Sequence, residues 1–272
     1  MSFTMTFDSF PPDGPLRFGY VPWDADMYGF PFYELRCEDL LPEVIDEHLS
    51  SWLHSLPQDR ACLVYSRIPA RAVAVTRVLT GNGFYPVETT IDIYLPLSRL
   101  TPIVSHQPRL LRLRPTTEAD LPRIITIAGS AFSDDRLHVD TNLPSDKADR
   151  RYEHWIETGY RLGEPVFVLE DTRNGKVIGF FHLRETAPTT IDLSLAAIDK
   201  DYQKTAAGVL MYQATLVECQ TRGYQMATTR ISLNNTSVVN LYMRLGFAIR
   251  SAVTTLHWFR PAAREPGRSE KR

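Results

Sequence analysis

The segment 225–259 constrains the fold most, because it predicts a strand, a short helix and a second strand with tight connections. Within it, 235–247 reads NTSVVNLYMRLGF, and four residues recur at the helical spacing i, i+3, i+4 and i+7: Val238, Leu241, Tyr242 and Leu245. Asn235 is a typical N-cap residue, and Gly246 stands where the end of a helix favours glycine. The segment therefore predicts a short capped helix that directs Tyr242 inward.

The preceding residues extend this arrangement as an α/β pattern. Thr117 and Asp120 have the spacing of a capping box that opens a helix. A second helix is predicted over 207–221, with three residues on its inward face: Leu210, Ala214 and Val217. Alternating or apolar runs predict strands at 110–115, 166–170, 177–183 and 191–198. This order predicts an α/β fold with a mixed central β-sheet flanked by helices.

Proline spacing in 100–108 indicates a linker and hence two regions. We predict an N-terminal α/β domain over 1–105, a second domain over 109–260 and a disordered tail over 261–272, which is charged and contains proline. Residues 72–95 and 238–259 share the order apolar helix, Gly-Phe, strand. The N-terminal domain is therefore interpreted as a shortened, divergent copy of the second, although this connection is also common in unrelated folds.

Composition excludes several classes of protein. The 272 residues carry a net charge of −2, which provides no electrostatic basis for binding nucleic acid. The three cysteines, Cys37, Cys62 and Cys219, are far apart and form no C-x-x-C, so neither a disulfide framework nor a zinc site is expected. With neither a signal peptide nor a long apolar run, the chain is expected to be cytoplasmic and to have no membrane partner.

The turn before the second predicted helix could hold an anion. It reads DYQKTAAGVLM over 201–211, and the unpaired N–H groups at the start of a helix bind phosphates. Small residues at such a turn allow close approach of the backbone. Taken alone, the turn is weak evidence, because many connections between strands and helices contain Ala-Ala-Gly.

Together these segments resemble the GNAT (GCN5-related) N-acetyltransferases, over roughly 110–259. The resemblance implies acetyl-CoA as co-substrate, with its pyrophosphate at Gln203, Lys204, Thr205, Ala206, Ala207 and Gly208. The family has glycine where this chain has Ala206, so the match of this loop is partial. The main chain of Ala196, Ala197 and Ile198 would hold the pantetheine arm and the thioester carbonyl. Asn235 and Leu241 would contact the same arm.

The resemblance makes Tyr242 the general acid that protonates the departing thiolate. By spacing alone, a tyrosine on an apolar helix face is more often a core residue. Glu88 is predicted to be the general base, with Asp192, His182 and Glu185 as alternatives, although carboxylates on strands are more often surface groups.

Acceptor binding is predicted for Arg136 and His138, in a segment that could equally be an ordinary charged helix. His138 has no second histidine at ligand spacing, so no metal site is predicted.

The whole chain resembles more narrowly the acetyltransferases of nucleotide-linked amino sugars, such as the enzyme acting on dTDP-linked fucosamine. The similar segments are WDADMYGFPF (23–32), RLHVD (136–140) with DRRYEHWI (149–156), and TTLHWF (254–259). We therefore predict acetyl transfer from acetyl-CoA to the primary amine of a small molecule by direct attack. The alternatives are another amine (an amino acid, polyamine, antibiotic or peptide N-terminus) or a non-catalytic acyl-CoA sensor. A homodimer is left open.

Overall fold

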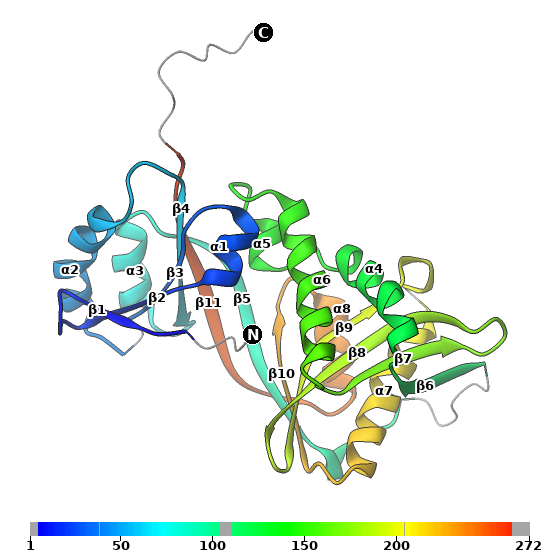
Figure 1. The fold of residues 1–272 in the computed structure, drawn as a ribbon. Helices are drawn as coiled ribbons and strands as arrows, with labels where there is room; N and C mark the ends of the chain where they lie inside the picture. Colours follow the sequence, from blue (N-terminus) through cyan, green and yellow to red (C-terminus); the bar gives the residue numbers. More distant parts are fainter. Residues whose placement is uncertain (1–4, 38, 104–109, 204, 263–272) are drawn as a thin grey trace, which may run out of the picture. The chain divides into compact units, whose positions relative to one another are not determined.

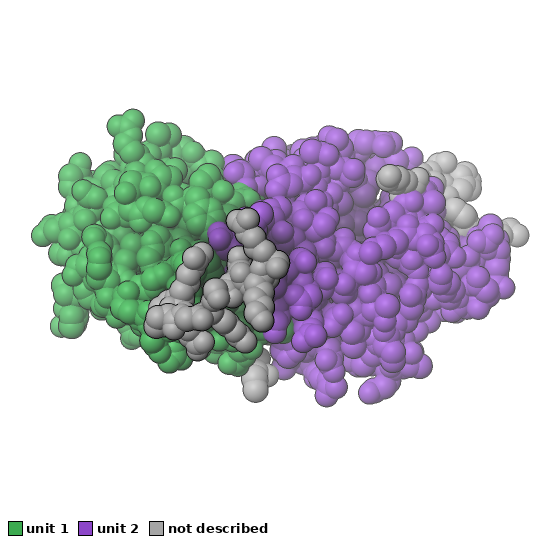
Figure 2. All heavy atoms as spheres, turned by 90° about the horizontal axis from the view of Figure 1, so that it is seen from above, with its two compact units in different colours: residues 1–88, 253–272 green, residues 89–252 purple. Residues whose placement is uncertain are grey.

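The computed structural model describes residues 5–37, 39–103, 110–203 and 205–262. Contacts divide the chain into two compact units, coloured separately in Figure 2. Unit 1 comprises residues 1–88 and 253–272, and unit 2 comprises residues 89–252. Each boundary between the units falls inside a strand and not at the predicted linker. Residues 104–109 of that linker and residues 263–272 of the predicted tail lie outside the described residues. The predicted domain limits stay a prediction.

Unit 2 contains the mixed sheet that the sequence predicts, in the strand order β5-β10-β9-β8-β7-β6. Only β9 and β10 pair in parallel, and the other neighbours are antiparallel. Its strands are β5 (Tyr85–Pro96, shared with unit 1), β6 (Leu111–Pro115), β7 (Val166–Asp171), β8 (Lys176–Ala187), β9 (Thr190–Ile198) and β10 (Met226–Ser232). Its α-helices are α4 (Leu121–Ala131), α5 (Arg136–Val139), α6 (Ser145–Arg161), α7 (Ala206–Thr221) and α8 (Thr236–Arg244). Short 3-10 turns are η1 (Leu97–Arg99), η2 (Glu118–Asp120) and η3 (Lys200–Tyr202).

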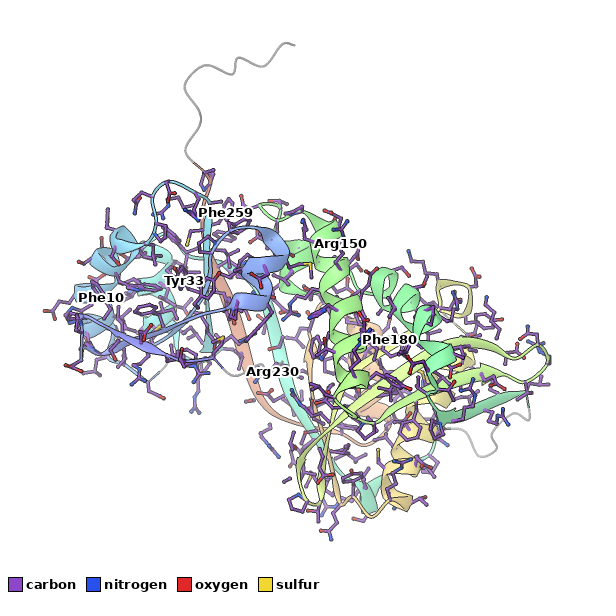
Figure 3. The ribbon with its side chains drawn as sticks, viewed as in Figure 1. Phe10, Tyr33, Arg150, Phe180, Arg230 and Phe259 are labelled. Atoms are coloured by element: carbon purple, nitrogen blue, oxygen red, sulfur yellow. The ribbon has the colours of Figure 1, made fainter. Side chains whose placement is uncertain are left out.

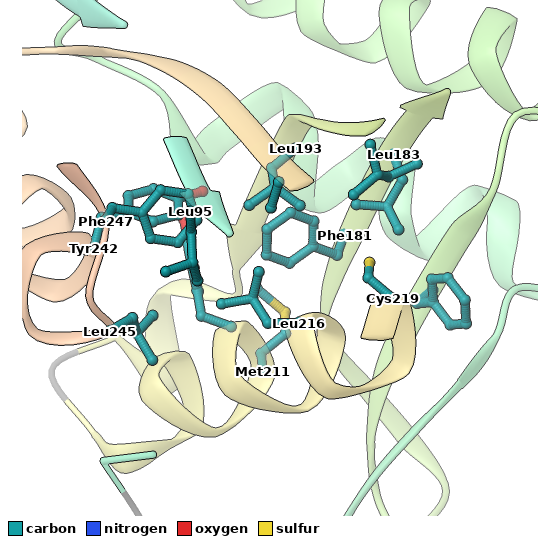
Figure 4. Packing of buried hydrophobic residues seen from close by; sticks show 14 of the residues in the cluster. Leu95, Phe181, Leu183, Leu193, Met211, Leu216, Cys219, Tyr242, Leu245 and Phe247 are labelled. Atoms are coloured by element: carbon teal, nitrogen blue, oxygen red, sulfur yellow. The ribbon is translucent and has the colours of Figure 1, made fainter. Parts of the chain in front are cut away.

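Helices cover both faces of this sheet (Figure 1). Successive residues of a strand point to opposite faces, and Phe180 and Phe181 of β8 accordingly enter different cores. Phe180 packs with residues of α4 and α6, whereas Phe181 packs with residues of α7 and α8 (Figure 4). The predicted capping box is confirmed, because Thr117 and Asp120 bond each other's backbone at the start of η2.

One predicted helix face needs correction. Leu210 and Ala214 of α7 are buried as predicted, but Val217 is 46% exposed. Several other residues of α7 are buried instead: Met211, Tyr212, Thr215, Leu216 and Cys219. Because α7 is apolar on most of its circumference, periodicity alone could not identify the buried face.

Unit 1 is a smaller α/β unit with the strand order β1-β2-β3-β4-β11. Its strands are β1 (Asp8–Phe10), β2 (Leu16–Tyr20), β3 (Phe32–Arg36), β4 (Cys62–Pro69) and β11 (Ala248–Arg260, shared with unit 2). Its helices are α1 (Pro22–Tyr28), α2 (Pro42–Ser55) and α3 (Val73–Gly81). Its core contains residues of α2 and α3, with Trp52 among the largest fully buried side chains. In the part of the chain that the structure describes, no helix is long and apolar enough to cross a membrane.

The two units repeat one order of strand pairings. In unit 2, β8 and β9 pair antiparallel, β9 and β10 parallel, and β10 and β5 antiparallel. In unit 1, β2 and β3 pair antiparallel, β3 and β4 parallel, and β4 and β11 antiparallel. The last strand of each series comes from the opposite half of the chain, β5 in unit 2 and β11 in unit 1.

The helix ends before those last strands also match. Gly83 and Gly246 have φ of +87° and +96°, a conformation that favours glycine. The following amides donate to equivalent carbonyls: Phe84 to Leu79 and Phe247 to Tyr242, each at 3.1 Å.

Candidate active site

Tyr242 lies inside the core of unit 2, on the inward face of α8. The helix begins as predicted, since the Asn235 side chain accepts a hydrogen bond from the Val238 amide at 3.2 Å. Tyr242 is 3% exposed. Its ring lies roughly perpendicular to those of Tyr212 and Phe247, with centroids 5.1 and 4.7 Å away. Figure 4 shows Tyr242 and Phe247 beside Leu95. The predicted inward position of this phenol is confirmed, because Tyr242 lies in the core of unit 2.

Burial keeps the Tyr242 phenol protonated. Removal from water raises its pKa well above the ordinary value, and the neighbouring Tyr212 raises it further. Burial raises the pKa of Tyr212 in the same way. The hydroxyl of Thr229 on β10 acts in the opposite direction and lowers the pKa of Tyr242. A group of this kind can supply a proton and cannot act as a base at neutral pH.

The strands beside Tyr242 separate. The parallel register of β9 with β10 covers Thr190–Asp192 and Met226–Thr228, yet β9 continues to Ile198 and β10 to Ser232. At the start of the separation, the Thr229 hydroxyl donates to the Leu193 carbonyl at 2.9 Å. The side chain of Thr229 thus satisfies a carbonyl that lies beyond the parallel register.

Backbone groups of β9 face this separation. The Asp199 amide donates to the Ile178 carbonyl of β8 at 2.8 Å. In an antiparallel pair, every second residue of a strand directs its N–H and C=O groups to the same neighbouring strand. Ala197, two residues before Asp199, therefore directs its backbone groups to β8. Ala196 and Ile198 direct their backbone groups to the opposite side, toward β10. Of the three residues predicted to hold a pantetheine arm, these two have backbone groups that can do so.

The N-terminus of α7 follows directly after β9. Thr205 caps it by accepting from the Ala207 amide at 3.2 Å, and the Gln203 side chain donates to the Ile198 carbonyl at 3.2 Å. Ala206, the residue that departs from the family pattern, begins the helix without the positive φ that would disfavour alanine. A Cβ added at Gly208 would meet only Ile198 Cγ1, at 4.0 Å, so the helix end is open there. Lys204 lies outside the described residues.

Cations also lie around this helix end. Arg123 and Lys176 both pair with Asp199, and the Lys176 ammonium lies 5.2 Å from the ring centre of Tyr202. Helix amides together with nearby cations suit a pyrophosphate. The residues described at the separated strands and at this turn therefore fit acetyl-CoA.

The predicted acceptor segment, which includes α5 and α6, is tied together by His138. Its Nδ1 hydrogen-bonds Asp135, its Nε2 lies 3.2 Å from an oxygen of Asp149, and its side chain is 7% exposed. Burial alone would lower the pKa of His138, but the two carboxylates raise it above the ordinary value. This geometry gives His138 a structural task between α5 and α6. Arg136 is 6% exposed. The roles of Arg136 and His138 in acceptor binding stay predictions.

The candidate bases lie in different surroundings. Asp192 stands at the last parallel pair of β9 and β10, where it accepts a hydrogen bond from Ser194 at 2.7 Å. His182 is fully buried against Glu164, with Nε2 to Oε2 at 2.6 Å. Glu185 accepts from the Tyr224 hydroxyl at 3.0 Å. Glu88, the predicted base, is half-buried and belongs to unit 1, so its role stays a prediction.

Tyr212 and Thr229 are part of the site and were not predicted. Tyr212 lies on α7, which carries apolar residues all round and gives no signal for a polar contact. Thr229 reads as an ordinary strand residue of β10. Their roles depend on which strands and helices meet, which sequence spacing does not encode.

A parallel pair that separates beside a capped helix and a buried phenol is the arrangement that the resemblance to acyl-CoA-dependent acyltransferases predicts. Comparison with known proteins agrees, since residues 131–247 match the model of the acetyltransferase (GNAT) family. This match covers less than half of the chain, and the protein is an acyltransferase with the GNAT fold. Acetyl-CoA is the co-substrate of the family.

Similar proteins support the fold over most of the chain. A GCN5-related N-acetyltransferase from Sphaerobacter thermophilus superposes with a TM-score of 0.64 at 15% identity, covering 91% of this chain and 78% of that one. A tandem GNAT protein from the clavulanic acid biosynthesis pathway gives 0.58 at 14% identity, covering 92% and 79%. The spore coat polysaccharide biosynthesis protein SpsD of Bacillus subtilis (strain 168) is 21% identical over 200 residues, 73% of this chain and 67% of that protein.

Proposed function

We propose that the protein transfers the acetyl group of acetyl-CoA to a primary amine of a small molecule by direct attack, with Tyr242 as general acid. The observation that carries this is the separation of β9 from β10 at Leu193, in the same unit as the buried, protonated phenol of Tyr242. Bound acetyl-CoA supplies an activated thioester. The backbone amides of Ala196 and Ile198 are proposed to donate to the oxygen that gains negative charge.

Each remaining step is assigned to a residue. Tyr242 holds the proton that the leaving sulfur takes up, a role in which a positioned side chain contributes about 10²–10⁴-fold. The cofactor contacts proposed for Gln203 to Gly208, Asn235 and Leu241 follow the family pattern. The acceptor amine must lose a proton, and Asp192 and Glu88 are the carboxylates proposed to take it. Asp192 belongs to the same unit as Tyr242 and marks the point where β9 leaves β10.

We propose an amino sugar, including one linked to a nucleotide, as the acceptor. The name of the Bacillus relative, a protein of spore coat polysaccharide biosynthesis, supports a substrate related to sugars. Amino acids, polyamines, antibiotics and peptide N-termini are the competing acceptors.

The test is release of free thiol from acetyl-CoA over a panel of these amines, with the acetylated product identified by mass spectrometry. We expect turnover on amino sugars above the rate of hydrolysis without amine. Turnover on none of the amines would overturn the proposal, and turnover on another class alone would replace the acceptor. Asp192→Asn and Glu88→Gln identify the base: the true one loses turnover near neutral pH and regains it at high pH, where the amine arrives deprotonated.

We also propose that unit 1 is a divergent copy of the cofactor-binding half of unit 2 and no longer binds cofactor. The matched strand pairings and helix ends support the duplication. Leu79 stands at the place of Tyr242, and α2 begins at Pro42 with no side-chain cap, whereas Thr205 caps α7. Calorimetric titration should give one acetyl-CoA per chain, and a stoichiometry of two would refute the loss of the second site.

A further inference from the structure

Polar side chains continue across the sheet of unit 2 from Asp192. The registers place Asp192 opposite Thr228, Thr228 opposite Tyr94, and Arg230 opposite Asp92. Between them in sequence, Thr229 of β10 and Ile93 of β5 are buried, Ile93 in the core of α7 and α8. Because successive residues alternate between faces, the polar residues lie on the opposite face of the sheet, beside the separated strands.

Arg230, labelled in Figure 3, is anchored by a hydrogen bond to Asp92. Its Nε donates to Asp92 Oδ1 at 2.7 Å, and Asp92 Oδ2 accepts from the Ser251 hydroxyl at 2.6 Å. Burial alone would raise the pKa of Asp92, but the hydrogen bonds from Arg230 and Ser251 lower it, so this carboxylate stays charged. The two terminal nitrogens of Arg230, which bind an oxyanion as a fork, lie outside that hydrogen bond.

The surroundings of Arg230 favour an anion. Its side chain is 48% exposed, and a second guanidinium, that of Arg250, lies 4.9 Å from the ring centre of Tyr94. Arg250 also acts electrostatically on Asp92. Two cations, Arg230 and Arg250, therefore act on one carboxylate, that of Asp92.

The position of Arg230 sets the size of a matching ligand. It lies two residues beyond Thr228, the last residue of β10 that pairs with β9. Two residues of a strand span roughly 7 Å. A molecule whose amine lies at the separated strands would therefore reach Arg230 with an oxyanion about one sugar ring away from that amine.

We propose that Arg230 binds an anionic group of the acceptor, a phosphate or a carboxylate, and so selects acidic amines over neutral ones. This rests on the proposed acetyl transfer and names the substrate class of the same site. Arg230 is a specificity residue here: it takes no proton and does not touch the thioester.

Two matched pairs of amines test the proposal, one for each anion. Glucosamine 6-phosphate against glucosamine tests a phosphate, and lysine against its decarboxylated form, cadaverine, tests a carboxylate. The wild type should favour the anionic member of at least one pair by tenfold or more in kcat/KM. Arg230→Gln should remove this preference by raising KM, with kcat and the neutral amine unchanged. Arg161→Gln, at an exposed ion pair on α6, should leave the preference intact.

A binding measurement keeps this test separate from that of the enzymatic function. Glucosamine 6-phosphate and lysine are titrated calorimetrically onto each variant with coenzyme A at saturation, which fills the pyrophosphate site. Weaker binding to Arg230→Gln alone supports the anion site even if no amine is acetylated. Equal affinity of the three proteins for both probes, or an equal loss of kcat/KM for neutral and anionic amines, would overturn the proposal.

Discussion

Gly159 lies within α6, where glycine normally destabilises a helix, and its replacement by alanine tests the packing around His182. A Cβ at this position would lie 2.5 Å from His182 Nε2, 2.8 Å from His182 Cε1 and 3.0 Å from an oxygen of Glu164. The His182 side chain is 1% exposed and hydrogen-bonded to Glu164, so it has no free space to move into. The glycine is explained by this close approach.

The net effect of Gly159→Ala follows from three opposing contributions. Alanine favours the helix by about 1 kcal/mol. Overpacking costs about 1–3 kcal/mol, and loss of the hydrogen bond between His182 and Glu164 costs about 1.5–3 kcal/mol. The variant should therefore be destabilised by about 1.5–5 kcal/mol, which for a unit of this size lowers Tm by roughly 3–20 °C.

Differential scanning calorimetry measures this shift, with Gly81→Ala as the matched control. A Cβ at Gly81 of α3 meets nothing within 4 Å, so that variant should be neutral or slightly stabilised. In a His182→Ala background the cost of Gly159→Ala should largely disappear, because contacting residues couple. An unchanged Tm for Gly159→Ala, or the same loss in both backgrounds, would refute the reasoning.

Three further predictions concern the supports of the site. Hydrogen bonds from Arg114 lower the pKa of Asp120 to about 2, so its contribution to stability is present above about pH 4 and lost as the pH falls toward 2. The Tm advantage of the wild type over Asp120→Asn should therefore shrink over that range. A constant difference in Tm would contradict the pairing. The pKa of His138 is raised in the folded protein, so its contribution to stability has the opposite pH dependence. The Tm advantage of the wild type over His138→Gln should be complete below about pH 6.5 and decline as the pH rises through the pKa of the folded state. Growth of this advantage with pH would exclude the ion pairs. Thr229→Val leaves the Leu193 carbonyl without its donor and should lower the free energy of unfolding, measured with urea, by about 1–3 kcal/mol. Thr229→Ser keeps the hydroxyl and should lower it clearly less. Equal losses for the two variants would contradict a stabilising hydrogen bond.

Much of unit 2 follows from local patterns. The spacing of Val238 to Leu245 and the residues Asn235 and Gly246 predict α8 with its two ends, because caps and helical periodicity act over a few residues. The position of Tyr242 inside the core follows from the same spacing. The departure at Ala206 is tolerated for a reason that only backbone angles reveal, since its φ is not positive.

Nonlocal contacts account for what the sequence did not predict. The prolines of 100–108 suggested a boundary, but the compact units are set by strand pairing, and β5 and β11 each extend from one unit into the other. The sequence does not indicate that His138 contacts Asp149, eleven positions away, and its role in acceptor binding stays a prediction. The ring contact of Tyr242 with Tyr212 and the hydrogen bond from Thr229 to Leu193 likewise join elements that only the fold brings together.

The central claim is that the buried phenol of Tyr242 donates the proton in acetyl transfer. Tyr242→Phe keeps the ring that packs on Phe247 and removes only the hydroxyl. Turnover with saturating acetyl-CoA and amine should fall about 100-fold or more, while the calorimetric Kd of acetyl-CoA stays within about threefold. Tyr224→Phe, at a tyrosine that bonds Glu185, should match the wild type in both measurements. Unchanged turnover in Tyr242→Phe would contradict the claim.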